Sequence, residues 1–99
     1  MNRELAIETL KRIRPRLAER GIAHAAVFGS VARGEAGAFS DIDVVVAPAS
    51  GVFLNLFDLG GVQAILEEAF AGVNVDVVVE PVRRRALRQG IERDRAHAF

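Results

Sequence analysis

The 99-residue sequence contains no cysteine, tryptophan or tyrosine. The lack of cysteine excludes disulfide bonds, thiolate metal sites and a cysteine nucleophile. Histidine is scarce as well, because His24 and His97 are the only two and cannot supply a histidine-rich metal site alone. Aromatic stacking on a bound ligand is limited to the six phenylalanines. The thiol-dependent classes of enzyme and metalloprotein are therefore excluded.

Long apolar segments are also missing. No apolar run approaches the roughly 18 residues that a membrane span needs, and Arg3, Glu4 and Glu8 interrupt any signal-peptide pattern. We therefore expect a soluble, cytosolic protein without membrane contact. The chain has no internal repeat or low-complexity linker, and its length predicts one domain over residues 1–99.

Charge is balanced overall but unevenly distributed. Thirteen basic and thirteen acidic residues give a net charge of zero, which argues against indiscriminate nucleic-acid binding. Residues 1–20 and 81–99 are basic, whereas residues 21–80 carry Arg33 as their only basic residue against eight carboxylates. The acidic centre favours binding of a cation.

Hydrophobic periodicity predicts alternating helices and strands. Residues 4–20 have one apolar helical face, which Pro15 should kink or break. The other predicted elements are strands at 23–28, 41–47 and 73–80, a helical turn at 31–33, and helices at 56–70 and from 82 to the C-terminus. This order favours a small α/β or α+β sheet with helices packed on one side.

Two aspartates at alternate positions open the second predicted strand. Side chains at i and i+2 of a strand share a face, so Asp41 and Asp43 should project together. Two carboxylates this close repel each other unless a cation neutralises them, and oxygen ligands suit Mg²⁺ or Mn²⁺. Asp76 interrupts an apolar strand and would join them if its strand is the neighbour. The pattern predicts a divalent-metal site.

A phosphate-binding turn is predicted upstream of these aspartates. Gly29 and Ser30 lie at a strand-to-helix turn, where glycine permits close backbone approach and the Ser30 hydroxyl can hold a phosphate. Arg33 follows and would pair with phosphate charge. Taken singly, each feature has an ordinary structural explanation, and Asp76 could be a charge that protects an edge strand from aggregation. Their ordered combination favours the functional interpretation.

The chain resembles the minimal nucleotidyltransferase (MNT) domain of the DNA polymerase β-like superfamily in three motifs that occur in the family's order: GSVARG from Gly29, SDID from Ser40 and VDV from Val75. The resemblance covers almost the whole chain. It implies an α+β fold, the palm-like mixed sheet flanked by helices. It also implies a metal-binding catalytic triad of Asp41, Asp43 and Asp76.

The same resemblance implies that Gly29, Ser30 and Arg33 lie near the phosphates of ATP or another NTP, and that two Mg²⁺ ions, or Mn²⁺, assist transfer. MNT proteins of this size resemble antitoxins paired with HEPN-domain ribonuclease toxins, and some transfer AMP from ATP to a hydroxyl on that toxin. We expect this activity here. Two alternatives remain open: an antitoxin acting by stoichiometric binding alone, and a nucleotidyltransferase acting on a small molecule or nucleic acid.

The basic C-terminal segment has two interpretations. Arg83, Arg84, Arg85 and Arg88 form a solvated helical face or a docking surface for an acidic partner. If the arginines are only solvated, the apolar side with Leu87 and Ile91 becomes the candidate interface.

Overall fold

One mixed sheet of four strands organises the chain. The computed structural model describes residues 1–37 and 40–99, so the loop expected after Gly34 lies partly outside the described residues. The sheet has the order β3-β2-β1-β4, with β1 antiparallel to both of its neighbours and β2 parallel to β3. The strands are β1 (Ile22–Phe28), β2 (Ile42–Pro48), β3 (Val75–Val79) and β4 (Ala96–His97). The predicted mixed sheet is confirmed.

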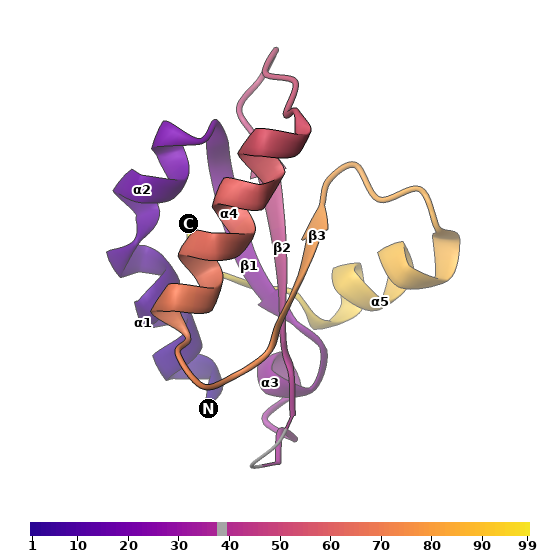
Figure 1. The fold of residues 1–99 in the computed structure, drawn as a ribbon. Coiled ribbons are helices and arrows are strands. Elements are labelled where there is room, and N and C mark those ends of the chain that lie inside the picture. The colour runs from indigo at the N-terminus through magenta and orange to yellow at the C-terminus, as the bar shows by residue number, and fades with distance from the viewer. Residues whose placement is uncertain (38–39) are drawn as a thin grey trace.

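Among the described residues, five helices flank this sheet: α1 (Arg3–Arg12), α2 (Arg14–Glu19), α3 (Gly29–Arg33), α4 (Leu56–Ala69) and α5 (Arg85–Asp94). Figure 1 shows α1, α2 and α4 on one side of the sheet and α5 on the other. The expectation that the helices pack on one side is therefore wrong for α5. The apolar residues of β2 that point away from the main core must also be shielded from water. α5 covers part of that face.

The predicted break at Pro15 is confirmed. The long N-terminal helix divides at Ile13, and Pro15 lies in the first turn of α2, where its missing N–H breaks no helical hydrogen bond. The apolar face continues through the break, because Leu10 and Leu17 are both fully buried. Asn2 caps α1 by accepting a hydrogen bond from the Leu5 amide at 2.7 Å.

The side chains of alternate β2 residues point into two different layers of the fold. Ile42, Val44 and Val46 are fully buried in the main core beneath α1, α2 and α4. Val45 points to the opposite face, where it packs in a smaller cluster with Ile91 of α5. Ile91 is only 1% exposed, so the Leu87 and Ile91 side of α5 packs on the sheet and is not a free interface.

The C-terminal strand was not predicted. The expected helix ends at Asp94, and β4 pairs with β1 instead, with the Ala98 amide donating to the Ala25 carbonyl at 2.9 Å. Five residues after α5 are too few to establish a periodic pattern. The backbone edge of β1 supplies the hydrogen bonds that stop the helix from continuing.

α4 is the longest helix, with 14 residues. Within residues 1–37 and 40–99, none of the helices combines the length and apolar character that crossing a bilayer requires. Phe53, three residues before α4, and Phe57, in its first turn, have 95% and 86% of their surface exposed. They follow the C-terminal end of β2, at the opposite end of the sheet from Asp43.

Candidate active site

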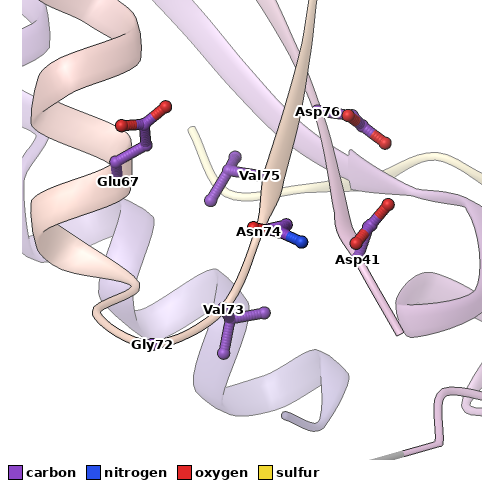
Figure 2. Close-up of a pocket in the computed structure, with 7 residues that line it drawn as sticks. All are labelled: Asp41, Glu67, Gly72, Val73, Asn74, Val75 and Asp76. Atoms are coloured by element: carbon purple, nitrogen blue, oxygen red, sulfur yellow. The ribbon is translucent and has the colours of Figure 1, made fainter. Parts of the chain in front are cut away.

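Asp43 and Asp76 are brought together by the pairing of β2 with β3. The two residues are direct partners in the parallel register, and directly opposed residues of neighbouring strands project from the same face. Asp41 stands one residue before β2 and two before Asp43. In Figure 2 the side chains of Asp41 and Asp76 project to the same side of β3. The predicted clustering of the three carboxylates is thus present at one end of the sheet.

The charges of this cluster act on the carboxyl pKa of Asp43, whose side chain is only partly exposed. Burial raises the pKa of its carboxyl, and the charges of Asp76 and Asp41 raise it further. Arg33 acts in the opposite direction and lowers the pKa of Asp43. The cluster therefore disfavours three simultaneous negative charges, and a positive charge brought between the carboxylates would be stabilised.

A cavity of about 610 Å³ opens beside the carboxylates. Its lining comprises Asp41, Asp76, Glu67 of α4 and the segment 72–75 that leads into β3. Figure 2 shows Glu67 on one side of β3, with Asp41 and Asp76 on the other. The cavity is rich in carboxylates and lies against the start of an edge strand.

The Gly29 turn lies directly against Asp43. β1 ends at Phe28, which is the register partner of Asp43, and Gly29 then opens α3 with a φ of +71°. L-residues rarely adopt this left-handed conformation. A Cβ at Gly29 would also collide with the Asp43 carboxylate. Only glycine lets this turn approach the carboxylate, and Ser30 follows at the start of α3.

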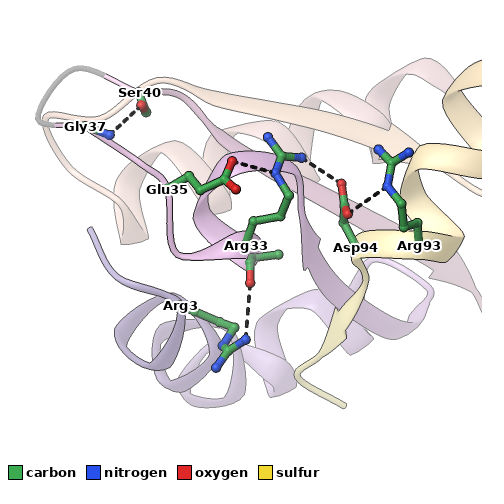
Figure 3. Close-up of polar contacts among 8 residues, drawn as sticks. Arg3, Arg33, Glu35, Gly37, Ser40, Arg93 and Asp94 are labelled. Atoms are coloured by element: carbon green, nitrogen blue, oxygen red, sulfur yellow. Dashed lines mark hydrogen bonds and ion pairs between the residues drawn. The ribbon is translucent and has the colours of Figure 1, made fainter.

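Arg33 lies at the C-terminal end of α3 and is held by two carboxylates. Its Nε is 2.9 Å from Glu35 Oε2, and its Nη1 is 2.7 Å from Asp94 Oδ2 (Figure 3). The Asp94 side chain is only 6% exposed and also accepts a hydrogen bond from Arg93 Nε at 3.2 Å. Asp94 therefore ties α5 to α3, close to the Gly29 turn.

Sequence reasoning missed Glu35 and Asp94. Glu35 is two residues from Arg33, and a charge pair over this spacing is a weak signal. Asp94 is 61 residues away from Arg33, so no local pattern connects the two. Only the packing of α5 across the sheet brings them into contact.

The donor chemistry of the cluster fits a divalent metal ion of the hard class. Asp41, Asp43 and Asp76 offer oxygen ligands only, which Mg²⁺ and Mn²⁺ prefer. In the part of the chain that the structure describes, no set of three His, Cys, Asp or Glu side chains encloses an ion as it stands. Burial and, after it, repulsion from Asp76 and Asp41 raise the pKa of Asp43, and a bound ion would relieve that repulsion.

Comparison with known proteins gives a consistent result. The family model for the nucleotidyltransferase domain matches residues 10–97. No curated protein matches the sequence. A solved structure assigned as a minimal nucleotidyltransferase is 36% identical, and the match covers 97% of this chain and 95% of that chain with a TM-score of 0.68.

Two more distant structures share the fold. One is a toxin–antitoxin complex with AMP-PNP, which is 20% identical over 90% of this chain and 72% of that chain, with a TM-score of 0.69. The other is a tri-AMPylated HEPN toxin from Shewanella oneidensis in complex with its MNT antitoxin, 17% identical over 94% and 71% of the two chains, with a TM-score of 0.64. These likenesses agree with the fold that the sequence motifs suggested.

Proposed function

Because this chain belongs to the nucleotidyltransferase domain family, we propose that it transfers AMP from ATP to a hydroxyl on a HEPN-type ribonuclease toxin and so neutralises that toxin. The observation that carries the proposal is the meeting of Asp41, Asp43 and Asp76 beside the Gly29 turn. The complexes with AMP-PNP and with an AMPylated HEPN toxin support the choice of nucleotide and partner.

The three aspartates would hold the metal ions, two Mg²⁺ in our proposal or Mn²⁺. When bound, such ions neutralise the triphosphate and stabilise the charge that develops on the entering and leaving oxygens. Asp41 and Asp43 would hold the ions from one strand end, where they lie two residues apart. Asp76 completes the set from the neighbouring strand.

The remaining roles belong to the turn and to Asp76. Gly29 and Ser30 orient the triphosphate through the backbone approach and the hydroxyl, and Arg33 contributes positive charge beside it. The acceptor oxygen forms a bond to the α-phosphorus as the bond between that phosphorus and the bridging oxygen of pyrophosphate breaks. Asp76 takes the proton of the hydroxyl, and pyrophosphate leaves.

The acceptor must come from outside the described fold. The carboxylates lie at one end of a single small sheet, and the cavity beside them is open. A protein partner that covers this cavity would complete the cleft and exclude water from it. This favours a protein acceptor over a small molecule.

The test uses ATP labelled on the α-phosphate, Mg²⁺ and the HEPN-domain protein encoded beside this chain. Label should appear on the partner in stoichiometric amounts, and its ribonuclease activity should fall in parallel. An Asp43→Asn chain is the control and should transfer none. Loss of ribonuclease activity without label would instead establish the stoichiometric alternative, and label confined to an added small molecule or RNA would establish the other.

A further inference from the structure

β3 is an edge strand whose backbone points alternately toward β2 and away from it. The Ile42 amide donates to the Asn74 carbonyl, and the Glu80 amide donates to the Val46 carbonyl, each at 2.9 Å. In a parallel pair this pattern turns the N–H and C=O groups of even-numbered β3 residues toward β2. The groups of Val75, Val77 and Val79 therefore point to the outer edge.

Most of these outward groups are open. Gln63 Nε2 of α4 donates to the Val75 carbonyl at 3.0 Å. Within the described residues, no other hydrogen bond reaches the outward groups of Val77 or Val79. Figure 1 shows β3 running between α4 on one side and α5 on the other. An unpaired edge of this kind is a template for one more extended chain.

The open edge leads directly to the carboxylates. The cavity lined by Asp41, Glu67 and Asp76 lies against the first residues of β3 (Figure 2). On a strand added outside β3, the residue opposite Asp76 would project from the same face as Asp76 and Asp43. A hydroxyl at that position would approach the reacting phosphate from the acceptor side.

We propose that the outer edge of β3 is the acceptor-docking site, and that an extended segment of the partner protein pairs with it as a fifth strand. The residue that carries the acceptor hydroxyl lies opposite Asp76. A lysine or arginine next to it in sequence projects from the other face of the sheet and faces Glu67. The inference rests on the proposed function for the identity of the reaction. The hydrogen-bonding pattern requires an extended polypeptide, and the acidic cavity selects a basic one.

A second copy of this chain is the competing occupant. Pairing of β3 with the β3 of another copy would bring two Asp76 side chains and two acidic cavities close to one contact. Like charges there would oppose association. A basic segment has no such penalty.

The first test removes one outward N–H. Val77→Pro deletes the amide hydrogen on the outer edge and leaves the bonds to β2 intact, a position where edge strands tolerate proline. Val77→Ala is the reference variant, because it loses side-chain packing but retains the N–H. With labelled ATP and the HEPN-domain partner, Val77→Pro should show at least a tenfold higher KM for the partner than Val77→Ala. Their ATP affinities, measured by titration calorimetry, should match. Equal KM values would overturn the proposal.

The second test needs neither a variant nor catalysis. Amide hydrogen exchange of Val77 and Val79 in the wild-type chain should slow at least tenfold when the partner binds, whether or not label is transferred. If the partner binds and both amides still exchange as fast as in the free chain, the docking site is wrong. If the amides are protected but no label is transferred, only the proposed reaction is contradicted. Protection that arises in the chain alone, with a dimer by sedimentation, would assign the edge to a second copy and overturn the proposal.

Discussion

The two faces of β2 have different roles: one packs in the main core, and the other carries Asp43. The side chains of Ile42, Val44 and Val46 are buried among apolar residues in the main core. On the opposite face, Asp43 lies in a cluster of like charges against a left-handed glycine. Strand alternation alone separates the two roles, so neighbouring residues can be changed with opposite consequences for stability and chemistry.

The largest effect should come from Asp43→Asn. We expect transfer to fall at least about a thousandfold, because the proposed metal site would lose one of its carboxylates and with it several kcal/mol of transition-state stabilisation. In metal-free buffer at pH 7 the Tm should equal or exceed that of the wild type, because the repulsion from Asp76 and Asp41 is relieved. Single-turnover transfer assays and thermal melts measure the two effects. A variant that transfers at the wild-type rate would remove Asp43 from the site.

Gly29→Ala should harm both stability and transfer. A left-handed φ costs a non-glycine residue about 1–2 kcal/mol, and the new Cβ also meets the Asp43 carboxylate. Gly34→Ala is a matched control, because Gly34 has a φ of +75° but a Cβ added there would meet no atom within 4 Å. Urea unfolding should show a larger loss for Gly29→Ala, and adding Asp43→Ala should recover the excess. Equal losses would mean that Asp43 moves aside freely.

Val44→Ala should lower the stability of the core without changing the transfer rate at the site. Removing two buried methyl groups and leaving a cavity should lower the free energy of unfolding by about 2–3 kcal/mol. The transfer rate per folded molecule should stay within about twofold of the wild type, because Val44 points away from the carboxylates. Chemical denaturation together with active-site-normalised assays provides the comparison. A proportional loss of rate would show that the two faces of β2 are coupled.

The difference between the two faces also explains what could be predicted from sequence. The core face follows from apolar periodicity and β-branched content, which located β1, β2, β3 and α4 to within a few residues. The proline itself located the break at Pro15. The pairing of Asp41 with Asp43 follows from strand alternation. Asp76 joins this pair only if β3 is the neighbour of β2. The family resemblance implied that arrangement, and the register confirms it.

Apart from Glu35, the features that were missed depend on contacts between residues that are distant in sequence. β4 has two residues and exists because β1 offers a backbone edge. The placement of α5 on the far face depends on Ile91 filling the space over Val45. The Arg33–Asp94 ion pair follows from that placement, so the pairing could not be assigned from local sequence. Helical periodicity reports which residues are buried, but not which face of the sheet they cover.

The smallest expected effect concerns Asp94, the link between α5 and α3. Hydrogen bonds from Arg93 and, against the opposing effect of burial, from Arg33 lower the pKa of the Asp94 carboxyl. A lowered folded-state pKa stabilises the protein above the unfolded value of about 3.9, and this contribution is lost as the pH falls through the folded value. Asp94→Asn should therefore lower the Tm at pH 7, and the difference from wild type should shrink steadily below about pH 4. Arg93→Ala, which removes the first of the two donors, should give part of the same loss at pH 7. A difference in Tm that stays constant from pH 7 to about pH 2 would mean that packing of the side chain, and not its charge, holds α5 against α3.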